Sequence, residues 1–506
     1  MAIIRSRHLV VPALAVLAAA LSACMVGPNY KRPAVASTPA FKELAGWKTA
    51  APSDALDRGD WWTLFNDPLL NDLEAKVAVS NQNLAAAEAA YRNAHAMVAE
   101  QRAALFPTVD LSGSANVSGG GGAGSSTINT GTGGTGTGGT GTGGTGTGGT
   151  GTGTTVTRGT VQRYQVSVGA TWAPDIWGRV RRAIAGAKAN AQATAADVAN
   201  AKLSAQTELA TDYLQLRADD EQIRLLQTTA DAYQRALQVA KNRYAQGVAA
   251  KSDVLTAETT LLDAQAQTEQ TVQARATLEH AIAVLTGQPP AALAIEPRSQ
   301  FTPSIPGVPV GLPSELLERR PDVAAAERRA KNANEQIGVQ VAAYYPTITL
   351  TPSLGFASSS LSKLFSSSAF TWTLGGDATQ ILFDGGARKA RVAEARATYD
   401  QNVAEYRQTV LTAFQQVEDE LAAGKYLEQQ QRFRAEASAA ADENEKIVLN
   451  QYRAGQASAT DVVTAENTAL SARINLVGVE QSQLTAAVSL IEALGGGWTT
   501  AQLPKS

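Results

Sequence analysis

Apolar residues recur along this chain with two periods, which divide it into helices and strands. From Asn66 to about Arg102 they recur every three to four positions, which predicts a helix. A second helix is predicted from Arg179 to about Tyr244, and at 1.5 Å per residue it would span about 100 Å. A compact globular domain needs no helix of that length. The apolar seam of this helix has the seven-residue spacing of a coiled coil, at Leu209, Leu216, Ile223, Ala230, Leu237 and Tyr244.

Four shorter segments alternate apolar with polar residues and are predicted as strands. They lie at about 107–117, 163–173, 347–357 and 369–382. In the second segment, Tyr164, Val166 and Val168 alternate with polar or small residues. Successive side chains of a strand point to opposite faces, so each strand has one apolar and one polar face.

One stretch occurs twice and marks an internal repeat. Residues 244–258 read YAQGVAAKSDVLTAE and residues 452–466 read YRAGQASATDVVTAE, which agree at eight of fifteen positions without a gap. In each copy an incoming helix is broken at Gly247 or Gly455, and a return helix starts six residues later. Each copy is therefore predicted to be the tip of a helical hairpin.

These patterns give the chain a two-fold organisation. The predicted parts are a signal peptide (1–23), an extended N-terminal arm (24–65), a first repeat (66–287), a Pro-rich linker (288–320), a second repeat (321–495) and a C-terminal tail (496–506). Between the two strands of the first repeat lies a Gly- and Thr-rich stretch at 118–160. It has almost nothing to bury and is predicted to be a disordered loop.

The N-terminus has the pattern of a bacterial lipoprotein leader. A basic start and an apolar run from Leu9 to Leu21 precede Ser-Ala-Cys24, which completes the form of a lipobox. On this interpretation residues 1–23 are removed and Cys24 carries a covalent N-terminal lipid. Met25 stands where an Asp would retain the protein in the inner membrane, so the outer membrane of a Gram-negative cell is predicted. The alternative is an ordinary secretory signal with a chance cysteine.

Composition and charge narrow the classes of function. A formal net charge of -3 leaves no basic surplus for binding nucleic acid. Cys24 is the only cysteine, and once the leader is removed His95 and His280 are the only histidines. No group of residues has the spacing of metal ligands or of a catalytic site, so neither an enzyme nor a cofactor is predicted. The paired acids 219–220 and 418–419 are interpreted as solvated helix faces.

The strands indicate how chains would assemble. Two-faced strands of about ten residues are typical of outer-membrane barrels, with a small soluble sheet as the alternative. Four strands cannot close a barrel, and an open edge is untenable in lipid. Two chains would supply eight strands whose side chains fill the interior, whereas three would supply twelve and leave a lumen. The predicted fold is an α+β membrane protein, a homotrimer with a 12-stranded β-barrel and a periplasmic tunnel of long coiled-coil hairpins.

Several motifs make the chain resemble a known family. They are Cys24-Met25-Val26-Gly27-Pro28-Asn29-Tyr30 with Arg32-Pro33, Trp61-Trp62, Glu318-Arg319-Arg320-Pro321-Asp322-Val323, Phe383-Asp384-Gly385-Gly386 and both hairpin tips. With these motifs the chain resembles the TolC-like outer membrane efflux proteins of the lipoprotein OprM and NodT type. The resemblance implies a passive exit duct for drugs or other toxic small molecules. It also implies two partners, a periplasmic adaptor docked on the tips and an inner-membrane resistance-nodulation-division transporter that supplies the energy.

Two other functions stay open at this point. The same duct could serve an ABC transporter or a type I secretion system. A surface-anchored structural or adhesive lipoprotein is the other alternative, with the Gly/Thr stretch making contacts outside the cell. The duplicated strand-and-hairpin units argue against it, because adhesion needs no long tube.

The tips hold the candidate site residues. Three-fold symmetry would turn a tip residue on the axis into a ring, and rings of charge control pores. The candidates for a periplasmic gate are Tyr452, Arg453 and Asp461. The candidates for adaptor docking are Tyr244, Gly247, Lys251, Asp253 and Gly455, with Arg243 nearby as a further charged tip residue. A second interpretation assigns Ser252 or Asp253, and Thr460 or Asp461, to helix N-capping and the two glycines to helix ends, and both interpretations can hold.

Overall fold

The structure is a computed structural model, and it describes residues 25–35, 40–44, 60–119, 160–298, 304–308 and 319–504. The chain folds into two compact units. The sheet unit comprises 104–175 and 344–382, and the remaining residues form the helical unit. Each repeat therefore contributes to both units. In the ranges described, no helix is both long and apolar enough to cross a membrane.

Several predicted features lie outside the described residues. The signal peptide 1–23 and the lipidation site Cys24 precede the first described range. Most of the Gly/Thr stretch 118–160 falls between residues 119 and 160. The linker 288–320 is described at 288–298, 304–308 and 319–320.

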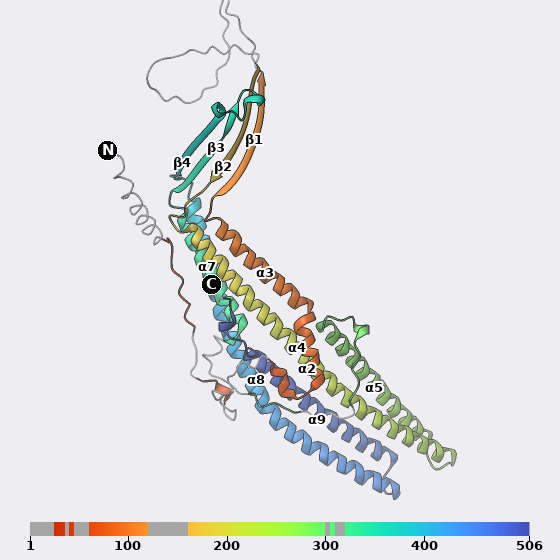
Figure 1. Cartoon of the computed structure of the whole chain (residues 1–506). Coiled ribbons are helices and arrows are strands. Elements are labelled where there is room, and N and C mark those ends of the chain that lie inside the picture. Colours follow the sequence, from red (N-terminus) through yellow and green to blue (C-terminus); the bar gives the residue numbers. More distant parts are fainter. Residues whose placement is uncertain are drawn as a thin grey trace, which may run out of the picture. The chain divides into compact units, whose positions relative to one another are not determined.

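The sheet unit is a four-stranded antiparallel sheet in the order β1-β2-β3-β4 (Figure 1). Its strands are β1 (Thr108–Gly119), β2 (Thr160–Thr171), β3 (Thr347–Ser358) and β4 (Phe370–Thr379). The two repeats meet at the β2–β3 pair, where Tyr164 lies opposite Ser358. Large apolar side chains on the sheet are exposed, among them Leu111 at 75% and Leu374 at 74%. Such side chains favour a position against lipid or further protein.

Strand β4 is shorter than the predicted segment 369–382. Its ladder with β3 ends at the pair Thr347 and Thr379. Pro346 precedes β3 and has no N–H with which to extend the pairing. The side chain of Gln380 turns away and donates to the carbonyl oxygen of Tyr344 at 3.1 Å. The apolar residues Ile381 and Leu382 of the predicted segment thus lie beyond the last residue that has a strand partner.

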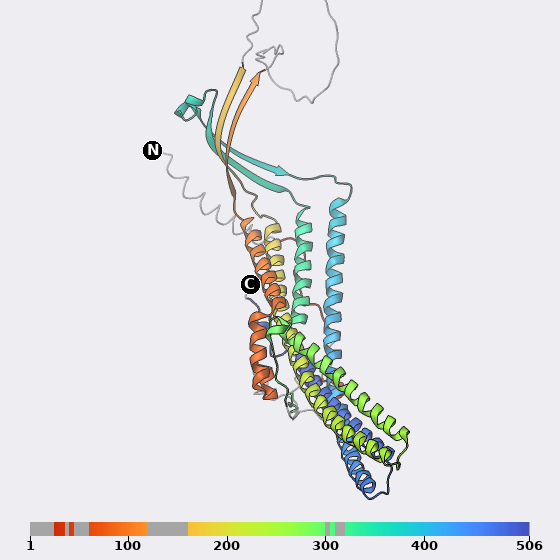
Figure 2. The same ribbon diagram turned by 90° about the vertical axis from the view of Figure 1, so that its right-hand side faces the viewer.

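Each repeat contributes one long hairpin to the helical unit (Figures 1 and 2). The hairpins are α4 (Arg179–Ala245) with α5 (Lys251–Leu285), and α8 (Ala387–Arg453) with α9 (Ala459–Ala493). Helix α4 is the central element, because it also packs against α3 (Gln82–Ala103), α7 (Pro321–Ala342) and α9. Seam residues Leu209 and Leu216 are fully buried, whereas Tyr244 is 48% exposed in the last turn.

The main apolar core lies where α2 (Pro68–Ser80), α4, α5, α8 and α9 meet. Three aromatic residues of the turn Trp61–Phe65 are buried in it. The ring of Trp61 packs edge-to-face against those of Trp62 and Phe65, with centroids 5.8 and 6.4 Å apart. The other large side chains of this core include Leu70, Leu73, Leu209, Tyr213, Leu216, Ile282, Leu421, Leu484 and Leu490.

The segment predicted as one helix from Asn66 to Arg102 forms two helices, so that prediction is wrong. α2 (Pro68–Ser80) and α3 (Gln82–Ala103) are separated by Asn81, whose backbone is extended. The Asn81 side chain accepts the N–H of Leu84 at 3.0 Å and donates to the carbonyl of Leu285 at 2.9 Å. The second partner lies 204 residues away in sequence, so the local period does not reveal the break.

Residues 25–35 are bound to the helical unit by hydrogen bonds. Arg182 of α4, whose side chain is 2% exposed, donates to the carbonyl of Gly27 at 3.1 Å and pairs with Glu335 of α7 at 2.8 Å. Gly27 has φ of +92°, and a Cβ there would lie 2.6 Å from the backbone of Gly338. Only glycine fits at position 27, which explains why the N-terminal motif has a glycine there.

Candidate gate at the hairpin tips

The two tips share one backbone conformation. Gly247 and Gly455 each have φ of +74° directly after the incoming helix. The N–H of Gly247 donates to the carbonyl of Tyr244 at 2.9 Å, and that of Gly455 donates to Tyr452 at 3.0 Å. A left-handed backbone costs a residue with a Cβ about 1–2 kcal/mol, so both turns favour glycine.

The return helices begin differently in the two tips. Ser458 is the N-cap of α9; its Oγ accepts the N–H of Asp461 at 3.2 Å, and the Asp461 carboxylate accepts the N–H of Ser458 at 2.8 Å. This is a capping box. The N-cap of α5 is Ala250, which has no side-chain acceptor, so only the contact from its N–H to Asp253 remains, at 3.4 Å.

The prediction of the N-cap residues is therefore wrong, because the N-caps are Ala250 and Ser458 and each aspartate occupies the third helical position. Asp461 still has a capping role, because its carboxylate completes the capping box of α9. Side-chain and backbone hydrogen bonds from Ser458 lower the pKa of Asp461. Its carboxylate is thus engaged within its own turn.

Two hydrogen bonds join the hairpins near the tips. Arg243 of α4 donates to the hydroxyl of Tyr452 of α8 at 3.3 Å. Tyr233 of α4 donates to the side-chain oxygen of Asn467 of α9 at 2.8 Å. The structure thus brings one gate candidate, Tyr452, into contact with the first hairpin. Sequence reasoning missed the second bond. Tyr233 lies three positions after Ala230 of the predicted seam, but nothing in the sequence marks Asn467 as its partner.

A cavity of about 570 Å³ lies between the two hairpins at this end of the helical unit. Its lining includes Val239, Arg243, Asp253, Leu449, Tyr452, Arg453 and Glu466. Three candidate residues thus border it. Tyr244, Lys251 and Asp461 are exposed and are not part of this lining.

The second hairpin is also clamped internally. Arg473 of α9 donates to Asp442 at 2.8 Å and to Glu445 at 2.7 Å, both on α8.

Among the described residues, no group of three or more His, Cys, Asp or Glu is arranged to hold a metal ion.

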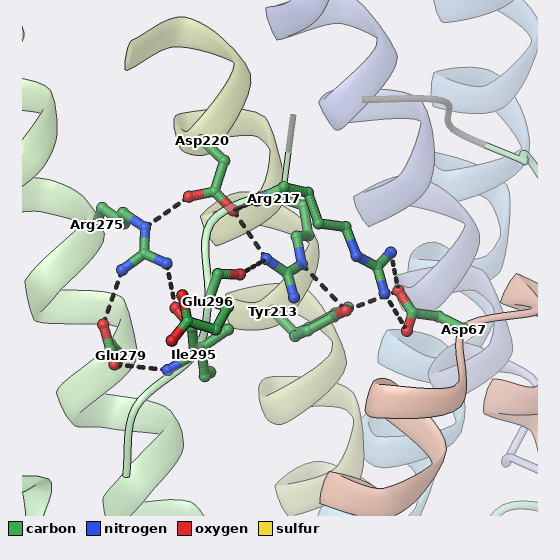
Figure 3. A network of polar contacts seen from close by, with 9 residues as sticks. Asp67, Tyr213, Arg217, Asp220, Arg275, Glu279, Ile295 and Glu296 are labelled. Carbon is green, nitrogen blue, oxygen red and sulfur yellow. Dashed lines mark hydrogen bonds and ion pairs between the residues drawn. The ribbon is translucent and has the colours of Figure 1, made fainter. Parts of the chain in front are cut away.

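A buried ion-pair network fixes the base of the first hairpin (Figure 3). Asp220 of α4 accepts hydrogen bonds from Arg217 at 2.8 Å and from Arg275 of α5 at 2.6 Å. Arg275 also donates to Glu279 at 2.8 Å and to the carbonyl of Ile295 at 2.6 Å. The network therefore joins α4, α5 and the segment that follows α5.

The same network reaches the start of α2. The hydroxyl of Tyr213 accepts from Arg217 at 3.1 Å and donates to Asp67 at 2.7 Å (Figure 3). Arg298 makes a bidentate pair with Asp67 at 2.7 and 2.9 Å. Burial opposes ionisation of Asp67, but the hydrogen bonds from Arg298 and Tyr213 outweigh it, so the pKa of Asp67 is lowered.

The interpretation of the paired acids as solvated faces is wrong for the first pair. Asp219 and Asp220 are 4% and 5% exposed. Glu418 is half-buried, and its carboxylate accepts the backbone N–H groups of Lys42 and Glu43 at 2.7 and 3.0 Å. In each place at least one partner comes from a distant part of the sequence, Arg275 for Asp220 and residues 42–43 for Glu418, which charge patterning along one helix does not reveal.

A four-stranded sheet combined with two long hairpins is the fold of one chain of a TolC-like outer membrane channel. The solved outer-membrane channel OprN matches with a TM-score of 0.81 and 27% sequence identity, over 94% of this chain and 100% of that chain. The family model named Outer membrane efflux protein matches residues 75–288 and 312–496. The chain belongs to the outer membrane efflux protein family.

Relatives with assigned roles match over nearly the whole chain. The antibiotic efflux pump outer membrane protein ArpC of Pseudomonas putida is 29% identical over 495 residues, which covers 96% of this chain and 95% of that protein. The toluene efflux pump outer membrane protein TtgC of Pseudomonas putida matches to the same extent. The protein is an outer membrane channel component of the efflux type.

Proposed function

We propose that this protein is the exit duct of a tripartite efflux system, through which drugs or other toxic small molecules pass from the periplasm to the exterior. An inner-membrane transporter of the resistance-nodulation-division type would supply the energy. The observation that carries the proposal is the match to efflux-pump outer membrane proteins across 96% of the chain. The family model also spans both tips. No catalytic step and no cofactor is required of a passive duct.

The proposed assembly is a homotrimer anchored by a lipid on Cys24. Three four-stranded sheets would supply the twelve strands of a barrel with a lumen. The exposed apolar side chains of β1 and β4 support a lipid-facing or chain-facing position. A periplasmic adaptor would dock on the tips, whose docking candidates are all exposed: Tyr244, Gly247, Lys251, Asp253 and Gly455.

The proposed closed gate consists of Tyr452, Arg453 and Asp461 on the second hairpin. The hydrogen bond from Arg243 to Tyr452 supports it, because the bond holds the second hairpin against the first. Single-channel conductance of Asp461→Ala channels tests the gate, with Asp253→Ala as the matched control in the other tip. Higher conductance for Asp461→Ala alone is expected. Unchanged conductance with faster amide exchange at the start of α9 would leave Asp461 with a capping role only.

The partners are tested in the native envelope. The tagged protein is crosslinked briefly in cells, purified in mild detergent, and its companions are identified by mass spectrometry. We expect an adaptor together with a resistance-nodulation-division transporter. Recovery of an ABC transporter would move the function to type I secretion or ABC-driven export. Recovery of no inner-membrane protein would remove support for the tripartite system.

A further inference from the structure

Glu466 is a partly buried acid that none of the interactions described above uses. It lines the cavity between the hairpins and ends the repeated tip segment on α9. Its Oε2 atom is buried, and no described residue forms a hydrogen bond with that atom. The adjacent residue, Asn467, accepts the 2.8 Å bond from Tyr233 that joins α9 to α4. A buried carboxylate oxygen without a partner is unfavourable when ionised.

Charged and titratable groups approach this cavity from all four hairpin helices. They are Tyr233, Arg235 and Arg243 of α4, Asp253 of α5, Glu445, Tyr452 and Arg453 of α8, and Arg473 of α9. Burial, together with the negative charge of Glu445, raises the pKa of Glu466 to about 7, while Arg235 acts in the opposite direction. Arg473 is already held by Asp442 and Glu445. The balance of these groups leaves Glu466 titrating near neutral pH.

The equivalent position in the first tip is occupied by the same residue type in a different environment. Glu258 closes the first copy of the repeated segment as Glu466 closes the second. Glu258 is exposed on α5 and is not part of the cavity lining. Burial of the carboxylate is therefore a property of the second hairpin and not of the repeat, and Glu258 is a matched control.

We propose that Glu466 is a gating residue whose protonated form holds the second hairpin against the first and whose ionised form favours separation of the hairpins near the tips. This inference rests on the duct function proposed above. Separation would admit water to the cavity and restore an ordinary carboxyl environment. The packed state binds the proton more tightly than the separated state, so it is favoured below pH 7 and loses that advantage as the pH rises through 7.

The size of the pH effect follows from the difference in proton affinity between the packed and the separated states. A carboxyl pKa that falls from about 7 in the packed state to 4.5 on separation would change the ratio of packed to separated states by about 30-fold between pH 5.5 and 8.5. Glu466 is only partly buried, and water that already reaches the cavity reduces this value. We therefore expect a change on the order of tenfold.

The test measures the distance between the tips without relying on transport. Spin labels are attached at Val248→Cys and Gln456→Cys, one exposed position in each tip turn, and distances are recorded by pulsed electron resonance at a series of pH values that includes 5.5 and 8.5. Singly labelled samples account for distances between chains and for any label at Cys24. The wild-type background should shift towards longer distances as the pH rises, with a midpoint between 4.5 and about 7, the carboxyl pKa values of the separated and packed states. Glu466→Gln should remain in the short-distance state, and Glu258→Gln should behave as the wild type.

A second variant keeps the test informative if Glu466→Gln fails to fold. Glu445→Gln removes the charge that raises the pKa of Glu466, and Asp442 still holds Arg473. We expect its midpoint to move below that of the wild type. A pH-dependent shift that survives Glu466→Gln, or the absence of any shift in the wild type, would overturn the proposal.

Conductance in planar bilayers, measured on the same samples, separates this inference from the duct function. Protein that forms no channel yet moves its tips with pH would refute the duct and leave the role of Glu466 intact. Protein that conducts ions while its tip distances do not change with pH would refute the role of Glu466 and would not contradict the duct function.

Discussion

Removal of the Asp220 side chain should loosen the base of the first hairpin. In the folded protein this carboxylate accepts hydrogen bonds from Arg217 at 2.8 Å, from Arg275 at 2.6 Å and from the backbone N–H of Arg298 at 3.3 Å. The side chain of Asp220 is 2% exposed. Asp220→Ala would leave Arg217 in a buried place without the carboxylate that compensates its charge, and would leave Arg275 with Glu279 alone.

The expected magnitude follows from the burial of the pair. Removing one partner of a buried ion pair costs about 3–5 kcal/mol, because an uncompensated charge stays behind. Each 1.4 kcal/mol is about a tenfold change in an equilibrium constant. Local opening of the segment after α5, which Arg275 holds through the carbonyl of Ile295, should become at least about 100-fold more frequent.

Amide hydrogen exchange followed by mass spectrometry measures this opening directly. Peptides that cover residues 293–298 and the end of α5 should exchange at least about 100-fold faster in Asp220→Ala than in the wild type. Asp197→Ala is the matched control on the same helix. Asp197 is 39% exposed and pairs at 2.6 Å with Arg329, which is itself 48% exposed. Such a pair is worth about 0.2–1 kcal/mol, so its loss should leave residues 293–298 unchanged.

The reasoning would be refuted by exchange at 293–298 that rises less than about threefold in Asp220→Ala, because the ion pairs would then contribute little to local stability. Equal effects of the two alanine variants would refute it as well. Asp220→Asn keeps one acceptor oxygen and should fall between the wild type and Asp220→Ala.

Four further predictions concern the tips, helix α9 and the core. Gly455→Ala forces a Cβ into φ of +74° and should destabilise the second tip by about 1–2 kcal/mol, read from faster proteolysis of the turn. Gly478→Ala, where a Cβ meets no atom within 4 Å, should instead stabilise α9 by about 0.5–1 kcal/mol. Burial raises the pKa of fully buried Glu74 to about 9, so the folded state retains a proton that the unfolded state releases, and stability falls as pH rises from the ordinary carboxyl range towards 9. Glu74→Gln should therefore raise the melting temperature more at pH 8 than at pH 5, and equal gains would contradict this. Tyr452→Phe removes the bond from Arg243 and should raise the channel open probability about two- to tenfold in bilayer recordings, whereas a lower open probability would count against the link.

The helical elements were predictable because their information is local. The long seam of α4 and the turn glycines follow from period and from backbone conformation, which neighbouring residues determine. The break at Asn81 was not predictable, because its amide donates to the carbonyl of Leu285 in another helix. The end of β4 was also not predictable from its own residues, because it depends on Pro346, which directly precedes the partner strand β3.

The polar sites show the same limit more strongly. Asp220 looks like one of two solvated acids on α4 until Arg275, 55 residues away, is folded against it. Glu466 and Glu258 are both preceded by a Thr-Ala pair, and neither has a cysteine or histidine nearby in sequence. The burial of Glu466 arises from packing between the hairpin helices, so a motif search cannot distinguish the two acids.

The two tips therefore separate what a duplicated sequence preserves from what the fold adds. The turn glycines have equal φ because the turn is defined within a few residues. The last acids of the two segments differ in burial because Glu466 borders the cavity between the hairpins, whereas Glu258 is exposed to solvent. A carboxylate surrounded by groups from both hairpins responds when the hairpins part, whereas a solvated carboxylate has little to lose or gain. Any proton-linked control of the contact between hairpins must then act through the second tip, although the sequence offers the same residue in both.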